Sequence, residues 1–235
     1  MINIVFEGAP GAGKTTIINE VVKKLKSFGI KVENTVDIDP TTPLYPILHN
    51  MNCTTPLITS NIEFSTVLYE TFIQTADYFY IKERILKQNN EINIFDRFYF
   101  SIYAYQKVLL EKEYGLSCKP LLKDLISILK FNNLKIDLVF YFVDEKNVYI
   151  ERAQKRDNIK YSKYEIETLK LFEKELEKII MHQPDYKVIK IFNENKDIVV
   201  ANIVNEVISI YKGKESNNVC NHKRRVGHWQ NNTNK

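Results

Sequence analysis

Short apolar runs alternate with longer amphipathic stretches along most of this chain. The runs predict buried strands at residues 2–6, 30–38, 91–95, 137–143 and 186–192. Between them, apolar residues recur at helical spacing and predict helices. These lie at 16–28, at 61–87, from about 97 to 131, up to about 156, at 162–182 and at 197–211. This order predicts an α/β fold of three layers, with a mostly parallel sheet between two layers of helices.

The polar residues that follow the predicted strands mark the edge of the sheet where a ligand is expected. Sheets of this class bind ligands at the carboxyl ends of their strands. A glycine-rich stretch follows the first strand, Asp39 follows the second, and Asp96 with Arg97 follows the third. The sequence therefore predicts that the chemistry of the protein is gathered at this edge.

The glycine-rich stretch fits the phosphate-binding pattern G-x-x-x-x-G-K-[ST]. It consists of Gly8, Ala9, Pro10, Gly11, Ala12, Gly13, Lys14, Thr15 and Thr16. In such a P-loop, backbone N–H groups surround phosphate oxygens, the lysine reaches the outer phosphates, and the threonine hydroxyl binds Mg²⁺. An ordinary turn with an exposed lysine is the alternative, and the strand before the loop and the helix after it argue against that. We expect these residues to bind a nucleotide and Lys14 to act in catalysis.

Asp96 and Arg97 directly follow an apolar strand. A carboxylate in this position can reach a metal ion beside Thr15, so Thr15 and Asp96 are the predicted metal-binding residues. Arg97 can hold a phosphoryl group through two parallel hydrogen bonds. The alternative is a structural Asp-Arg pair at the end of the strand.

Asp37 and Asp39 are two residues apart on an extended segment, so their side chains point the same way. We predict a catalytic and substrate-binding role for Asp39 alone, as a general base, as a ligand of the substrate hydroxyl, or as a contact of Mg²⁺ through water. A polar strand end before a turn is the alternative.

Three basic residues, Arg152, Lys155 and Arg156, lie where a predicted helix ends. Their spacing places Arg152 near the other two. Residues 152–162 could thus form a mobile lid that closes over the leaving phosphate, with Arg152 and Arg156 as catalytic residues. A solvated helix face is the alternative.

The long helix at 61–87 carries many aromatic residues, most of which we expect in the core. Phe64, Leu68, Phe72 and Phe79 recur at helical spacing. Phe72 could instead stack on a nucleobase, and Gln74 could form two hydrogen bonds with the edge of the base.

Composition and charge add the domain organisation. No apolar run is long enough to cross a membrane and the N-terminus lacks a signal peptide, so we expect a cytoplasmic protein without membrane contact. The three cysteines lie far apart in the sequence, as is typical of reduced thiols.

The basic residues are concentrated at the C-terminal end of the chain. Six of the 33 basic residues follow Tyr211, whereas only one of the 29 acidic residues does. We therefore expect a folded domain at 1–211 and a basic, disordered tail at 212–235.

The tail also offers two functional alternatives. Its cluster Lys223-Arg224-Arg225 could contact nucleic acid, and Cys220, His222 and His228 could bind a metal ion. A solvated extension fits better, because one charge cluster is a weak signal and the spacing matches no standard zinc site. We expect no nucleic-acid partner.

Several of these motifs, taken in order, resemble the thymidylate kinase family of nucleoside monophosphate kinases. The resemblance covers residues 1–211 and is carried by Glu7-Gly8, by Thr42-Pro43-Leu44, by Asp96-Arg97-Phe98-Tyr99 through Ala104-Tyr105-Gln106, and by Val143-Asp144 with the basic lid. It implies a five-stranded parallel sheet, ATP with Mg²⁺, transfer of the γ-phosphoryl group to a nucleotide in nucleotide biosynthesis, and a homodimer. By resemblance, Arg97 would hold the acceptor phosphate, and Tyr105 and Gln106 would line the acceptor pocket.

The chain departs from the family where the acceptor binds. Pro10 replaces an acidic residue of the loop, Ala76 stands where an arginine would follow Phe72 by one turn, and Asp37-Ile38-Asp39 replaces an arginine before Thr42. Asp39-Pro40 and Gln74 instead resemble deoxynucleoside kinases, which share the fold. A kinase of nucleosides or of other small alcohols is therefore the alternative function, and a nucleotide-binding regulatory ATPase comes after it.

Overall fold

The computed structural model describes residues 1–36, 39–54, 64–131, 134–144, 148–182, 185–192 and 195–229. Its strands are β1 (Ile2–Gly8), β2 (Val32–Thr35), β3 (Ile92–Asp96), β4 (Leu138–Val143) and β5 (Lys187–Phe192). They form one parallel sheet in the order β2-β3-β1-β4-β5. The α/β fold with a five-stranded parallel sheet is therefore confirmed.

The central strand β1 pairs with β3 on one side and with β4 on the other. Phe6 lies opposite Asp96, and Gly8 lies opposite Phe142. Every residue of β1 and β3 is buried, as expected for parallel strands covered on both faces. This register brings the start of the P-loop next to the end of β3.

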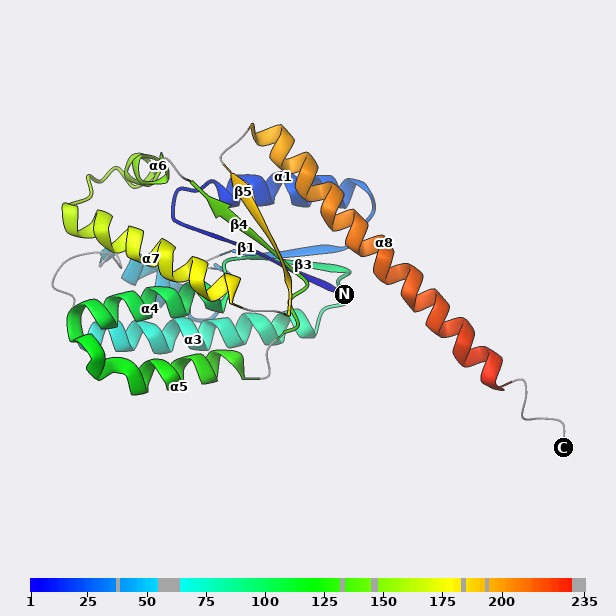
Figure 1. The fold of residues 1–235 in the computed structure, drawn as a ribbon, viewed down its shortest axis with the longest axis horizontal. Helices are drawn as coiled ribbons and strands as arrows, with labels where there is room; N and C mark the ends of the chain where they lie inside the picture. The colour runs from blue at the N-terminus through cyan, green and yellow to red at the C-terminus, as the bar shows by residue number, and fades with distance from the viewer. Residues whose placement is uncertain are drawn as a thin grey trace. The chain divides into compact units, whose positions relative to one another are not determined.

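Helices cover both faces of the sheet. The main core cluster joins β1, β3 and β4 to α3 (Phe64–Leu86), α4 (Tyr99–Tyr114), α5 (Lys119–Lys130) and α7 (Lys163–Met181), which lie together in Figure 1. The other face carries α1 (Lys14–Ser27), whose apolar stripe is buried. α6 (Val148–Asp157) precedes α7.

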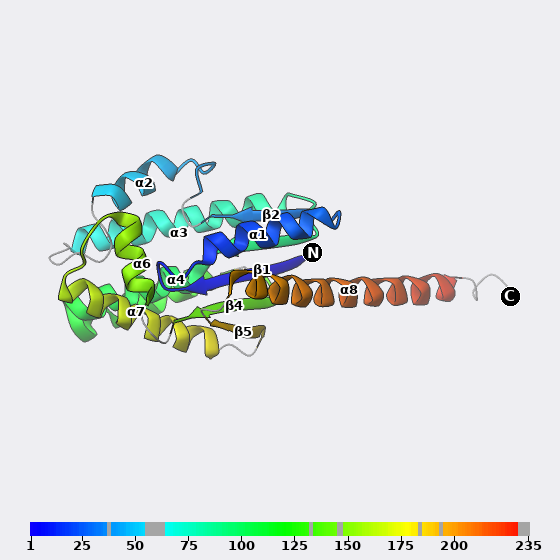
Figure 2. The same ribbon diagram turned by 90° about the horizontal axis from the view of Figure 1, so that it is seen from above.

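Two local differences separate the structure from the sequence expectation. β2 ends at Thr35, before the predicted end at residue 38, and residues 37–38 lie outside the described part. A helix that the sequence did not predict, α2 (Tyr45–Thr54), follows the loop and lies beside α3 (Figure 2). Pro46 obscured this helix in the sequence, although proline is well tolerated in a first helical turn.

The chain divides into two compact units, residues 1–193 and 194–235. The second contains α8 (Lys196–Trp229), which continues past Tyr211, where the sequence predicts the end of the folded domain. No proline interrupts residues 212–229, and the two glycines of this segment, Gly213 and Gly227, each cost a helix only about 1 kcal/mol relative to alanine. The helix differs from the expected disordered tail, and the domain boundary at 212 stays a prediction. None of the described helices combines the length and apolar character of a membrane span.

Candidate active site

The P-loop connects β1 to α1 and depends on glycines in the left-handed region. The φ angles are +147° at Gly8, +81° at Gly11 and +88° at Gly13. A Cβ atom on Gly8 would lie 2.7 Å from the carbonyl oxygen of Phe142, and one on Gly11 would lie 2.2 Å from that of Tyr149. Any other residue would clash at both positions, so the loop requires glycine there.

Lys14, Thr15 and Asp96 meet beside this loop. Lys14 is buried, and its Nζ donates to the carbonyl oxygens of Gly8, at 2.9 Å, and Ala9, at 3.1 Å. The Thr15 hydroxyl donates to Asp96 Oδ2 at 2.6 Å. One cation, one hydroxyl and one carboxylate thus lie at the start of α1, whose N-cap residue Gly13 offers no side-chain hydrogen bond. Such a helix N-terminus favours anions.

Arg97 is held in an unusual backbone conformation at the end of β3. Its φ is +72°, and its N–H donates to the carbonyl oxygen of Phe6 at 3.0 Å. A guanidinium nitrogen, Nη1, donates to Ser101 Oγ at 3.0 Å. The Arg97 guanidinium also lies 5.9 Å from the ring centre of Tyr105, which stacks on Phe172 at 3.7 Å. These contacts fix the direction of the guanidinium.

Glu7 supports Arg97 from the core. Its carboxylate accepts from the Phe98 N–H at 2.8 Å and from the Ser101 hydroxyl at 2.5 Å. Complete burial raises the pKa of Glu7 to about 7, although the nearby Arg97 charge and the Ser101 hydrogen bond act in the opposite direction. From the sequence, Glu7 has no role beyond the family resemblance. An acidic residue at the end of an apolar strand is the signal that points to such a role.

A cavity of about 240 Å³ opens beside these residues. It brings together six of the residues that the sequence assigned to the site, Pro10, Gln74, Asp96, Arg97, Tyr105 and Arg156. The wall also includes residues that the sequence did not assign, among them Glu70, Asp77, Tyr78, Lys82 and Ser101. A spacing of three or four residues places Glu70, Gln74, Asp77 and Ile81 on one face of the helix. This spacing is visible in the sequence and could have indicated that these residues share the site.

The lid residues have different positions. Arg156 is on the cavity wall and makes two hydrogen bonds to Asp157, at 2.6 and 3.0 Å. Arg152 is exposed and is not part of this wall. Asp144 Oδ2 accepts from the Tyr149 N–H at 2.8 Å and so begins the helix that carries both arginines.

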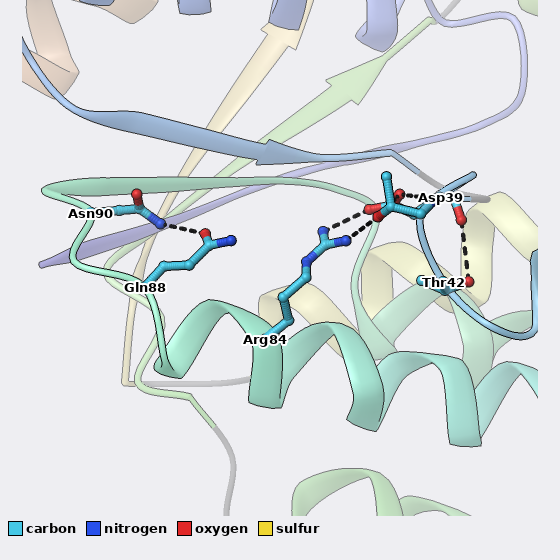
Figure 3. A network of polar contacts seen from close by, with 6 residues as sticks. Asp39, Thr42, Arg84, Gln88 and Asn90 are labelled. Atoms are coloured by element: carbon cyan, nitrogen blue, oxygen red, sulfur yellow. Dashed lines mark hydrogen bonds and ion pairs between the residues drawn. The ribbon is translucent and has the colours of Figure 1, made fainter.

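Asp39 is bound within its own loop and to the long helix. Arg84 Nη2 lies 2.7 Å from Asp39 Oδ2 (Figure 3). The Thr41 N–H and hydroxyl donate to Asp39 Oδ1 at 2.8 and 2.6 Å. Burial acts to raise the pKa of Asp39, but the Arg84 and Thr41 hydrogen bonds outweigh it and lower this pKa. Asp39 is not on the cavity wall, so its catalytic role stays a prediction that this geometry does not favour.

Phe72 and Gln106 lie outside the cavity wall as well. Phe72 is 59% exposed, because the face of α3 that meets the cavity is the one with Glu70 and Gln74. Gln106 is fully buried, and neither polar atom of its side chain has a hydrogen-bond partner among the described residues. Their predicted substrate contacts remain predictions. The side chains of Cys220, His222 and His228 fall outside the described part, and within it no cluster of possible metal ligands is present.

Comparison with known proteins decides the family. The thymidylate kinase family model matches residues 6–203. The chain belongs to the thymidylate kinase family. The probable thymidylate kinase of Sulfurisphaera tokodaii is 30% identical over 158 residues, which cover 67% of this chain and 72% of that protein.

A solved structure supports the fold of this family member. The thymidylate kinase from Ehrlichia chaffeensis matches with a TM-score of 0.58 and 19% identity, over 88% of this chain and 97% of the other. Membership of the thymidylate kinase family makes the protein a nucleoside monophosphate kinase.

Proposed function

We propose that this kinase transfers the γ-phosphoryl group of MgATP to the phosphate of a nucleoside monophosphate. The observation that carries this proposal is that Arg97 and Arg156 lie on the wall of one cavity, together with Asp96 and with Pro10 of the P-loop. Two guanidinium groups match a phosphate much better than a neutral hydroxyl. An anionic acceptor therefore fits this cavity better than a nucleoside does.

The donor residues have the right chemistry for ATP and Mg²⁺. Residues 8–16 would bind the ATP phosphates through backbone N–H groups and the Lys14 ammonium. Thr15 and Asp96 offer a hydroxyl and a carboxylate oxygen, and Mg²⁺ prefers oxygen ligands of this kind. When bound, the ion would neutralise charge on the transferred phosphoryl group.

The protein itself would act by positioning and charge neutralisation. Arg97, supported by Ser101 and Glu7, would orient the acceptor phosphate in line with the donor. Arg156 would approach from the lid and stabilise the charge that develops during transfer. A phosphate acceptor is already ionised at neutral pH, so this reaction requires no general base from Asp39.

A second candidate is phosphorylation of a nucleoside hydroxyl. Gln74 on the cavity wall favours it, because a glutamine can read a nucleobase edge. Against it stands the ion pair of Asp39 with Arg84, which engages the proposed base. We also propose that the protein forms a homodimer and acts in nucleotide biosynthesis, as the family resemblance implies.

An acceptor screen tests the proposal. ADP formation from ATP and Mg²⁺ would be measured with nucleoside monophosphates, with nucleosides and without acceptor. We expect turnover with at least one monophosphate, and Lys14→Ala should abolish it. Turnover with nucleosides but not with monophosphates would overturn the proposal. Hydrolysis that requires only a protein partner would favour the regulatory ATPase.

A further inference from the structure

One face of α3 brings a row of acceptor groups to the cavity. Glu70, Gln74 and Asp77 are spaced by four and three residues, and all three are on the wall. Most of this helix is apolar, so three polar side chains on its cavity-facing side require an explanation. In the described part of the chain, Gln74 donates to Glu70, whereas Arg97 donates to Ser101 and Arg156 to Asp157.

Glu70 and Gln74 already form a pair. Gln74 Nε2 donates to Glu70 Oε1 at 3.0 Å, and Glu70 is 6% exposed. Burial raises the pKa of the Glu70 carboxyl to about 8. No other hydrogen bond to this carboxyl is present in the described part of the chain. The second oxygen of Glu70 and the amide oxygen of Gln74 are thus available to a ligand.

Asp77, one turn further along α3, independently indicates a ligand. It is 4% exposed, and its Oδ1 is buried without a hydrogen-bond partner among the described residues. Burial raises its pKa, and a hydrogen bond with Thr42 compensates only in part. Buried polar atoms are nearly always paired in folded proteins, so an unpaired oxygen at a cavity wall is best explained by a donor that the ligand supplies.

Nucleobases differ in the number of donors that they can offer. Thymine and uracil present a single ring N–H between two carbonyl oxygens, whereas cytosine, adenine and guanine carry an exocyclic amino group. Ionised Glu70 would accept from the amino group, and protonated Glu70 could donate to a ring nitrogen while accepting from it. Thymine and uracil could contact only the protonated form of Glu70, because the ionised carboxylate would repel their carbonyl oxygens. Their single ring N–H also satisfies fewer of the acceptors on this face than an amino-bearing base does.

We propose that Glu70 and Gln74 form a specificity-determining pair that selects an acceptor whose base carries an exocyclic amino group. The proposal rests on the proposed function, since the acceptor must enter this cavity with its phosphate at Arg97. The N–H donors of the base favour the ionised carboxylate, which strengthens the contact once the base is bound. Asp77 supplies a further acceptor on the same face.

The test compares acceptors and variants. The values of kcat and KM would be measured for CMP, AMP and GMP and for dTMP and UMP, with the unmodified enzyme and with Glu70→Met. Glu83→Met is the matched control, because Glu83 is an exposed carboxylate on the same helix and is not on the cavity wall. Gln74→Leu provides a second variant if Glu70→Met does not fold.

We expect kcat/KM for the best amino-bearing acceptor to exceed that for dTMP and UMP by about tenfold or more, the typical net contribution of one hydrogen bond. Glu70→Met and Gln74→Leu should shrink this ratio by raising KM for the amino-bearing acceptors, with little change in kcat. Glu83→Met should preserve the ratio.

Preference of the unmodified enzyme for dTMP or UMP would overturn the proposal. An equal loss for all acceptors in both variants would also overturn it, because that result indicates a structural role only. Failure of the proposed function gives a different result, in which nucleosides are phosphorylated and monophosphates are not. In that case the ranking of cytidine, adenosine and guanosine against thymidine and uridine decides the role of the pair.

Discussion

Arg84 Nη2 lies 2.7 Å from Asp39 Oδ2, and this ion pair connects α3 to the loop that follows β2. The same loop is closed by hydrogen bonds from Thr41 to the Asp39 carboxylate and from Thr42 to the Asp39 carbonyl oxygen (Figure 3). A carboxylate with so many donors is a weak base. The geometry therefore indicates that Asp39 fixes the loop beside the cavity.

Asp39→Asn distinguishes this structural role from catalysis. Loss of a charged hydrogen bond should lower the free energy of unfolding by about 2 kcal/mol, while kcat stays within about threefold. Removal of a general base would instead reduce kcat by about 10²- to 10⁴-fold. Urea denaturation and steady-state kinetics measure the two quantities. A large loss of kcat in a fully stable variant would restore the catalytic interpretation of Asp39.

Thr15 provides a test of the metal site. Thr15→Val keeps the shape of the side chain but removes the hydroxyl, and we expect turnover to fall by about a hundredfold. The variant should also require more Mg²⁺ for half-maximal turnover. Thr15→Ser retains the hydroxyl and serves as the control, with turnover close to that of the unmodified enzyme. Equal activity of the valine and serine variants would rule out a ligand role.

Arg156 and Lys155 form a matched pair on α6. Both are exposed cations, but only Arg156 is on the cavity wall. Arg156→Ala should reduce kcat/KM for the acceptor by at least about a hundredfold, since a charged group that stabilises the transferred phosphoryl group contributes this much or more. Lys155→Ala should change it less than about threefold. Similar losses in both variants would point to general electrostatics rather than to the position of Arg156.

Glu7 makes stability depend on pH. Its pKa is near 4.5 in the unfolded chain and about 7 in the folded protein, so between these values the folded state binds more protons. Its contribution to stability is full below pH 4.5 and is lost as the pH rises through 7. The stability of the unmodified protein should therefore fall between pH 5 and pH 8 relative to that of Glu7→Gln.

Urea denaturation of both proteins at the two pH values gives this difference directly. The comparison with Glu7→Gln is necessary because burial also raises the pKa of Glu70, to about 8, which acts in the same direction. Parallel pH dependence of the two proteins would show that Glu7 does not titrate in this range.

Residues 212–235 are predicted to be dispensable for catalysis. The described residues on the cavity wall lie between Pro10 and Arg156. Truncation after Tyr211 should therefore leave kcat and KM nearly unchanged, as measured in the same coupled assay. A large loss of turnover would show that the domain boundary at 212 is misplaced.

The sequence predicted those parts of the site that depend on local signals. The P-loop needs glycines at fixed spacing between a strand and a helix, and all of these are visible in a short segment. The meeting of Thr15 and Asp96, 81 residues apart, followed from the rule that parallel strands end at one edge. Both features come from backbone geometry that residue type reveals.

The side-chain partners were not accessible in this way. Helical spacing predicts that α3 has distinct faces but does not predict which face meets the cavity. The sequence therefore pointed to Phe72 as a substrate contact and gave no indication that Glu70 lies on the cavity wall. Asp39 could not be assigned either, because its partner Arg84 lies 45 residues away and no local pattern connects them. Such contacts depend on how the helices pack, which a single sequence does not specify.

The close approach of Gly11 to α6 has a consequence for engineering. A Cβ atom at this position would meet the Tyr149 carbonyl oxygen at 2.2 Å and the Ala153 backbone nitrogen at 2.9 Å, and the same helix carries Arg156. We therefore expect a side chain at Gly11 to push against α6 and to shift Arg156 on the cavity wall. A redesign of the P-loop at this position should consequently include compensating changes in α6.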